Sequence, residues 1–92
     1  VDFTAAWCVT CQFNKRTVFS DAQVLAASDA RRVVLLRADW TRRDPAITAE
    51  LTRLGRNGVP VYAFYTPGAG RPRLMSELPT AADLREALAA LP

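Results

Sequence analysis

The stretch TAAWCVTCQFNK, residues 4–15, contains both cysteines of the chain, Cys8 and Cys11, with two residues between them. Its first two residues belong to residues 1–5, whose apolar character predicts a short buried strand. A helix is predicted to begin in the region of Cys8 and to run to about Phe19. The cysteine pair therefore lies where a strand passes into a helix.

This position gives the two cysteines different chemical roles. The start of a helix favours a thiolate, because unpaired backbone N–H groups and the positive end of the helix dipole stabilise negative charge there. Cys8 is therefore predicted to be the attacking sulfur. Cys11 lies one helical turn later on the same side of the helix, so it can resolve a mixed disulfide formed at Cys8. A C-x-x-C pair at such a junction strongly indicates redox chemistry.

A metal site, a haem attachment and an inert bridge are weaker interpretations of the cysteine pair. A structural zinc site normally takes four ligands, and without a third cysteine or any histidine only a site bridging two copies is left. A c-type haem attachment needs histidine directly after the second cysteine, where this chain has Gln12. An inert structural disulfide, or buried unreactive thiols, stays open, although so short a loop restricts the unfolded chain little. We expect no metal and no cofactor.

The composition fits one small domain over residues 1–92, and half of the residues are hydrophobic. Twelve basic and nine acidic residues give a formal net charge of +3. Neither aromatic-basic interleaving nor a nucleic-acid reading motif accompanies the arginine pairs at 31–32 and 42–43, so we expect no nucleic-acid partner. There is no apolar run long enough to span a membrane. The chain begins on Val1 inside a predicted strand, so we expect a fragment of a longer protein.

The remaining sequence alternates strand and helix patterns. The clearest strand runs from Val33 to Asp39, where four consecutive apolar residues predict a sheet covered on both faces. Ser20 to Gln23 has the spacing of a capping box, which predicts a second helix to about Ser28. In the first helix, the apolar positions include Val9, Phe13 and Val18. The remaining predicted elements are a helix over 45–54, strands over 59–65 and 73–76, and a helix from 80 to about 90. The order β-α-α-β-α-β-β-α indicates an α/β fold with parallel first strands and a closing hairpin.

Three segments of the chain resemble a known family. Residues 1–11, VDFTAAWCVTC, are similar to the active-site segment of the thioredoxin superfamily. Together with ADWT at 38–41 and GVP at 58–60, they resemble the C-terminal periplasmic domain of DsbD-type thiol:disulfide interchange proteins. The resemblance implies a thioredoxin-like domain over residues 1–92, an α/β fold with a central mixed sheet flanked by helices. It also implies that the first strand and helix of such domains are missing before Val1.

The same resemblance implies a function. The chain would be a protein-disulfide reductase domain that takes electrons from a membrane-embedded domain of the same protein and passes them to periplasmic thiol proteins. It would then be a periplasmic domain of an inner-membrane protein. Cys8 would be the nucleophile and Cys11 the resolving thiol, with Asp2 as the buried carboxylate beneath them. The alternatives are a free thioredoxin-like reductase and a non-catalytic thioredoxin-fold adaptor with an inert bridge.

Four more residues are assigned roles at the site. The resemblance implies that Trp7 flanks the active site and that Pro60 is the cis-proline facing the cysteines. A cis bond there would turn the backbone of Val59 toward the cysteines, where it would pair with an extended partner segment. Lys15 stands where related proteins often have an acid, and a cation there would favour the Cys8 thiolate. Plainer interpretations stay open: a partly exposed aromatic for Trp7, a strand-end polar residue for Asp2, a trans turn proline for Pro60 and a solvated cation for Lys15.

Overall fold

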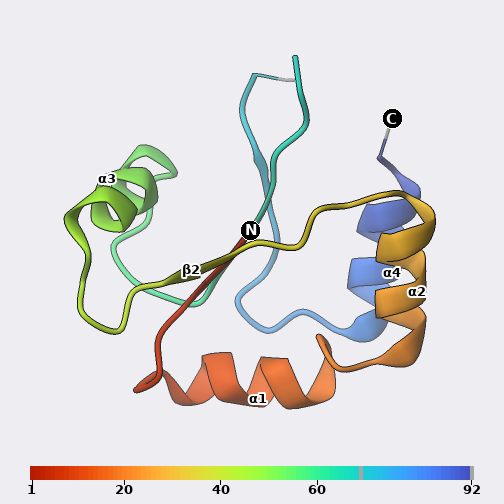
Figure 1. Cartoon of the computed structure of the whole chain (residues 1–92), viewed down its shortest axis with the longest axis horizontal. Coiled ribbons are helices and arrows are strands. Elements are labelled where there is room, and N and C mark those ends of the chain that lie inside the picture. The colour runs from red at the N-terminus through yellow and green to blue at the C-terminus, as the bar shows by residue number, and fades with distance from the viewer. Residues whose placement is uncertain (69, 92) are drawn as a thin grey trace.

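The computed structural model describes residues 1–68 and 70–91 (Figure 1). Its elements follow the predicted order β-α-α-β-α-β-β-α. They are β1 (Asp2–Thr4), α1 (Val9–Thr17), α2 (Ala22–Ala30), β2 (Arg37–Asp39), α3 (Pro45–Arg53), β3 (Val61–Phe64), β4 (Arg73–Leu74) and α4 (Ala81–Ala89).

The four strands form one mixed sheet in the order β2-β1-β3-β4. β1 runs parallel to β2 and antiparallel to β3, and β3 pairs antiparallel with β4. The predicted parallel first strands and closing hairpin are therefore confirmed. Because β1 is an inner strand, its carboxyl end, where the cysteine segment begins, has a strand on either side.

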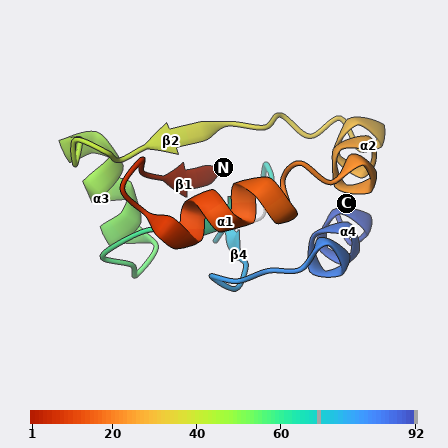
Figure 2. The same cartoon turned by 90° about the horizontal axis from the view of Figure 1, so that it is seen from below.

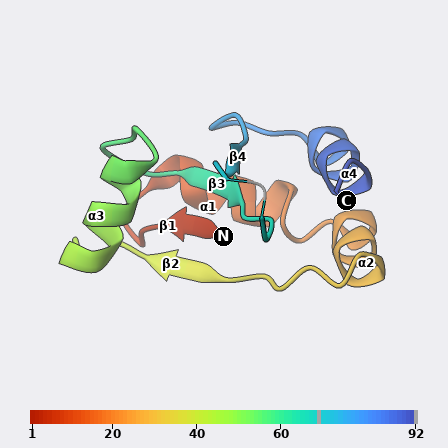
Figure 3. The ribbon, with the colours of Figure 1, turned by 90° about the horizontal axis from the view of Figure 1, so that it is seen from above.

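The helices cover the sheet unevenly. α1 lies in front of the strands in Figure 2 and behind them in Figure 3, so it covers one face of the sheet. α3 lies at one end of the molecule, and α2 and α4 pack side by side at the other. Two main clusters of buried side chains result, one between α3 and the sheet (Phe3, Trp40, Leu51, Leu54, Val61, Ala63) and one between α2, α4 and the end of α1 (Val18, Val24, Leu84, Leu88).

Side-chain caps fix where the helices begin. Asp44 caps α3 ahead of a first-turn proline, and Thr80 forms a capping box with Asp83 at α4. The prediction of a capping box that starts at Ser20 is wrong, because Asp21 is the N-cap of α2. Its carboxylate accepts hydrogen bonds from the backbone N–H groups two and three residues later. The Ser20 hydroxyl instead donates to a carbonyl oxygen in the last turn of α1.

The prediction of a strand covered on both faces from Val33 to Asp39 is also wrong. Only its last three residues form β2, and residues 34–36 are 57% to 73% exposed. Register explains the difference, since β1 begins at Asp2, opposite Arg37, and the preceding residues extend past its end. Among the described strands, none lies on the outer edge of β2. The apolar run therefore lines an open groove of about 990 Å³.

The first helix also turns a different face to the core than its apolar pattern predicts. Val9 and Phe13 are 83% and 56% exposed, whereas Cys11, Asn14 and Val18 are buried. Val9 and Phe13 are four residues apart and share one side of the helix. That side lies outward next to the first cysteine, so its apolar residues are available at the molecular surface.

Candidate active site

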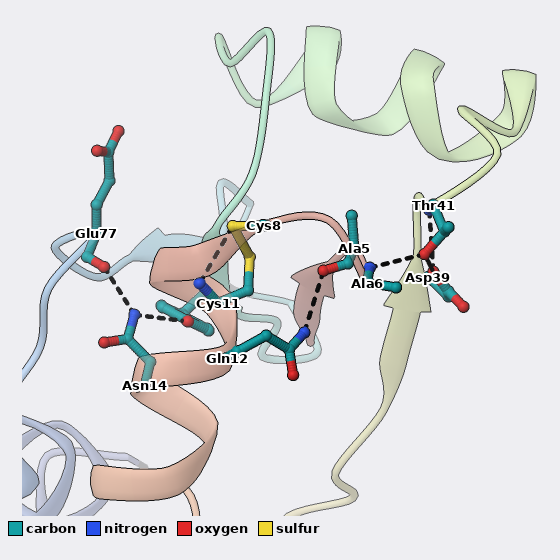
Figure 4. The surroundings of a disulfide bond; sticks show 10 residues. Ala5, Ala6, Cys8, Cys11, Gln12, Asn14, Asp39, Thr41 and Glu77 are labelled. Atoms are coloured by element: carbon teal, nitrogen blue, oxygen red, sulfur yellow. Dashed lines mark hydrogen bonds between the residues drawn. A yellow bond between two sulfur atoms is a disulfide. The ribbon is translucent and has the colours of Figure 1, made fainter.

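Cys8 is the N-cap residue of α1, with an extended backbone (φ −88°, ψ 107°). Its N–H donates to the carbonyl oxygen of Ala5 (3.1 Å), and its own carbonyl oxygen accepts from the N–H of Gln12 (3.1 Å). The Cys8 Sγ accepts a hydrogen bond from the backbone N–H of Cys11 at 3.1 Å (Figure 4). The first turn of α1 therefore directs a donor at this sulfur, which is the arrangement that stabilises a thiolate.

The two cysteines are joined as a disulfide, with their Cα atoms 5.2 Å apart (Figure 4). Both are buried, and Cys8 is slightly the more exposed of the two, at 7% against 3%. They pack together with Ala5 and with the half-buried Val59 from the loop before β3. The pairing of β1 with β3 thus brings a residue from a distant part of the chain against the sulfur pair.

The Val59–Pro60 peptide bond is cis, and Pro60 is buried directly before β3. β3 pairs with β1, so the loop that carries Val59 reaches the same end of the sheet as the cysteine segment. Val59 therefore packs against the buried cluster that contains Cys8 and Cys11.

The loop after β2 holds the residues that precede Cys8. The N–H of Ala6 donates to Thr41 Oγ1 at 2.8 Å, and Trp7 Nε1 donates to the Thr41 carbonyl oxygen at 3.0 Å. Thr41 is itself held by Asp39, whose carboxylate accepts from its backbone N–H and its hydroxyl (Figure 4). These two hydrogen bonds lower the pKa of the exposed Asp39 carboxyl. Trp7, at 49% exposed, is thereby tethered beside the cysteine pair.

Asp2 and Lys15 line a small polar hollow of about 210 Å³ together with Gln12 and Arg37. The Asp2 side chain is 24% exposed, and its Oδ2 lies 3.9 Å from Nε of Arg37. Burial raises the pKa of the Asp2 carboxyl, and the positive charges of Arg37, the N-terminal amine and Lys15 oppose this effect. Neither cysteine is among the described residues that line the hollow. A link from Asp2 to the sulfurs stays a prediction.

Asn14, one turn beyond Cys11, is a site residue that the sequence patterns did not reveal. It is completely buried, and its Nδ2 donates to the Tyr62 hydroxyl and to the Glu77 carbonyl oxygen, each at 2.8 Å. Burial raises the pKa of Tyr62 to about 12, although the hydrogen bond from Asn14 acts against the rise. Asn14 thus ties the cysteine-bearing helix to β3 and to the segment before α4. Its spacing of three residues from Cys11 was the signal that could have identified it.

Two further features bear on what the site can bind. Within residues 1–68 and 70–91, no three His, Cys, Asp or Glu side chains are grouped so as to hold a metal ion. No helix in the same ranges is long and apolar enough to cross a membrane. The arrangement is therefore a cysteine pair at a helix start, bordered by exposed apolar side chains and by the loop of Val59.

A mixed sheet with a C-x-x-C pair at the start of the helix after an inner strand defines a thiol-disulfide exchange domain of the thioredoxin class. The Thioredoxin-like family model matches residues 1–67, and the chain belongs to this family. The family named from the sequence is thus confirmed, together with the α/β fold that it implied.

Several curated relatives carry the name thiol:disulfide interchange protein. DsbD 1 of Pseudomonas aeruginosa is 38% identical over 68 residues, which are 74% of this chain and 11% of that protein. DsbD of Ralstonia nicotianae is 42% identical over 65 residues, which are 71% of this chain and 10% of that protein. The chain therefore spans about a tenth of the length of these relatives.

Two solved structures share the fold. The reduced form of the Neisseria meningitidis DsbD C-terminal domain matches with a TM-score of 0.78 at 24% identity, over 96% of this chain and 75% of that one. The oxidised form matches with a TM-score of 0.73 at 26% identity, over 96% and 74%. The chain is therefore a DsbD-like thioredoxin domain with a close cysteine pair.

Proposed function

We propose that residues 1–92 are a protein-disulfide reductase domain of a longer, DsbD-type inner-membrane protein. In this proposal the domain lies in the periplasm, takes electrons from a membrane-embedded domain of the same protein and passes them to periplasmic thiol proteins. The observation that carries the proposal is the backbone N–H of Cys11 donating to Cys8 Sγ at the start of α1. An inert bridge needs no such donor, whereas a sulfur that ionises at neutral pH does.

The proposed reaction begins with the reduced domain. The Cys8 thiolate attacks one sulfur of a partner disulfide, so that a Cys8–partner disulfide forms and the other partner sulfur leaves as a thiolate. Cys11 then loses its proton and attacks Cys8 Sγ, which forms the Cys8–Cys11 disulfide and releases the second partner thiolate. Both partner thiolates take up protons. Cys8 and Cys11 each lose one proton, so two electrons and two protons pass from the domain to the partner. A dithiol of the membrane-embedded domain reverses these steps and reduces Cys8–Cys11 again.

Asp2 and Lys15 are assigned supporting roles in this reaction. Asp2 accepts the Cys11 proton as a general base, and a raised pKa brings its carboxyl closer to the operating pH of such a base. Lys15 adds positive charge on α1, which favours the ionised forms of Cys8 and of Asp2.

The partner is expected to dock over the exposed apolar side chains next to Cys8. Trp7, Val9 and Phe13 supply these contacts, and all three are between 49% and 83% exposed. The backbone of Val59 supplies hydrogen bonds to an extended partner segment, in the manner of an added strand. Backbone pairing recognises extended shape more than sequence, so one domain can serve several thiol proteins.

Single-cysteine variants test the reaction. The reduced Cys11→Ser variant, mixed with a disulfide-bonded partner protein, should accumulate a covalent complex through Cys8 that mass spectrometry identifies. The matched Cys8→Ser variant should accumulate little, because Cys11 is less exposed and the helix-start N–H group donates to Cys8 Sγ rather than to Cys11 Sγ. Equal trapping by both variants, or by neither, contradicts the assigned roles.

The relay is tested separately in cells that export the domain with or without the membrane-embedded domain. Alkylation of free thiols should find Cys8 and Cys11 reduced only when the membrane-embedded domain is present. Reduced cysteines in both cases favour a free thioredoxin-like reductase. A domain that binds partner proteins equally well after both cysteines are replaced is an adaptor.

A further inference from the structure

Arg43, in the loop between β2 and α3, lies over two tryptophan rings next to the cysteine pair. Its Cζ is 5.1 Å from the ring centroid of Trp7 and 4.8 Å from that of Trp40, and the two centroids are 5.9 Å apart. Trp7 directly precedes Cys8 in the sequence. The guanidinium therefore lies over the side chain that directly precedes the proposed nucleophile in the sequence.

Several contacts hold this arrangement in place. Trp7 Nε1 donates to the Thr41 carbonyl oxygen, and Trp40 Nε1 donates to Thr48 Oγ1 at 2.8 Å, so both rings have fixed orientations. The backbone N–H of Arg43 donates to the Trp40 carbonyl oxygen at 2.9 Å. Arg43 has a φ of 53°, in the left-handed region that residues other than glycine adopt infrequently. The loop thus orders a long, charged side chain that an exposed arginine would otherwise leave mobile.

The two acidic residues that flank Arg43 in the sequence are engaged in other hydrogen bonds. Asp39 accepts hydrogen bonds from Thr41, and Asp44 accepts from the first N–H groups of α3. The ion pairs formed within residues 1–68 and 70–91 use three other arginines, Arg37, Arg53 and Arg56. A guanidinium that lies over aromatic faces keeps its in-plane N–H groups available, and these groups match a carboxylate in geometry and charge.

We propose that Arg43 is a specificity-determining residue that binds a carboxylate of the partner polypeptide next to the partner's reactive cysteine. The inference rests on the proposed thiol-disulfide exchange at Cys8 and goes beyond it by naming the chemistry of the preferred partner segment. Such a segment carries Asp or Glu within about one residue of its cysteine. Its carboxylate meets the ordered guanidinium while its sulfur meets Cys8.

The test uses two symmetrical peptide disulfides that differ by one residue, Glu or Gln, directly before each cysteine. The second-order rate constant for oxidation of the reduced 92-residue chain is measured with each peptide, at low and at high salt. We expect the Glu peptide to react about two- to fivefold faster than the Gln peptide at low salt, as an exposed ion pair allows. This preference should shrink at high salt.

Variants of the neighbouring arginines separate an Arg43 effect from general positive charge. Arg43→Gln should remove the preference for Glu, Arg43→Lys should keep part of it, and the matched Arg42→Gln should leave it nearly unchanged. For each protein the preference is expressed as the ratio of its rate with the Glu peptide to its rate with the Gln peptide, so that an effect of a substitution on both reactions alike cancels. A Glu preference that survives in Arg43→Gln, or that falls equally in Arg42→Gln, overturns the inference while leaving the exchange reaction intact. Failure of the unaltered chain to react with either peptide overturns both.

Discussion

Replacing Asn14 with alanine is expected to lower the free energy of unfolding by about 2–4 kcal/mol. The Asn14 side chain is fully buried and donates two hydrogen bonds, to the Tyr62 hydroxyl and to the Glu77 carbonyl oxygen. Its Oδ1 is also buried and has no hydrogen-bond partner among the described residues. The substitution therefore removes two favourable bonds and one unfavourable buried acceptor, and the balance between them decides its effect.

The opposing contributions can be estimated one by one. Two lost hydrogen bonds cost about 1 kcal/mol each, and the Tyr62 hydroxyl, buried without its donor, costs about 1–3 kcal/mol more. Removal of the unpaired Oδ1 raises the free energy of unfolding by about 1–3 kcal/mol. The space left by the missing amide adds roughly 1 kcal/mol or more. The penalty of the unpaired Tyr62 hydroxyl cancels the gain from removing Oδ1. The two lost hydrogen bonds and the cavity remain, so the variant is less stable.

Urea unfolding of the disulfide-bonded protein measures this change. With an m value of about 1–2 kcal/mol per M, a loss of about 3 kcal/mol lowers the midpoint by about 1.5–3 M. Tyr62→Phe should cost only about 1 kcal/mol, since Asn14 Nδ2 keeps its hydrogen bond to the Glu77 carbonyl oxygen. The loss of stability in the double variant should be smaller than the sum of the two single losses by about 1–2 kcal/mol. Arg16→Ala, an exposed change on the same helix, should have little effect. Strict additivity of the Asn14 and Tyr62 changes would refute the assigned network.

Three further outcomes are expected at the cysteine pair and its surroundings. In the reduced protein at neutral pH, an alkylating agent should label Cys8 well before Cys11, as mass spectrometry can show; the opposite order would exchange their roles. Because burial raises the pKa of Asp2, the folded state holds the Asp2 proton more tightly than the unfolded state. The stability from Asp2 is then present below the unfolded pKa and is lost as the pH rises through the folded pKa. Asp2→Asn should remove that decline in urea titrations across pH and should slow turnover without unfolding the domain; an unchanged pH slope and rate contradict this. Lys15→Glu should raise the pKa of Cys8 modestly at low salt, and a thiolate titration with no shift would make Lys15 a solvated surface residue.

Local signals in the sequence predicted most of the fold. The order of elements and the parallel start of the sheet both follow from patterns within a few residues. The cysteine pair at the helix start was equally visible, because the spacing of Cys8 and Cys11 and the strand before them are local as well. Family resemblance supplied the role of Trp7, which no local pattern indicates, and the role of Val59 followed from the proline after it.

The features that were missed depend on contacts between distant segments. The exposure of Val34 follows from where β1 begins, which a run of apolar residues cannot reveal. Phe13 fits an inward apolar position by spacing, yet the helix turns Asn14 inward because Tyr62 and Glu77 provide partners for its amide. The position of Arg43 over Trp7 depends on the path of the loop after β2, which the sequence pattern does not show.

The arginines on both sides of the exposed apolar run affect how copies of this chain behave in concentrated solution. Arg31 and Arg32 precede residues 33–36, and Arg37 follows them. An aliphatic run beside an unpaired sheet edge is a template for edge-to-edge aggregation, and flanking charges act as gatekeepers against it. When two copies approach through this edge, their arginines come together, and the repulsion between these like charges opposes aggregation. Added salt screens that repulsion and leaves the aliphatic attraction in place.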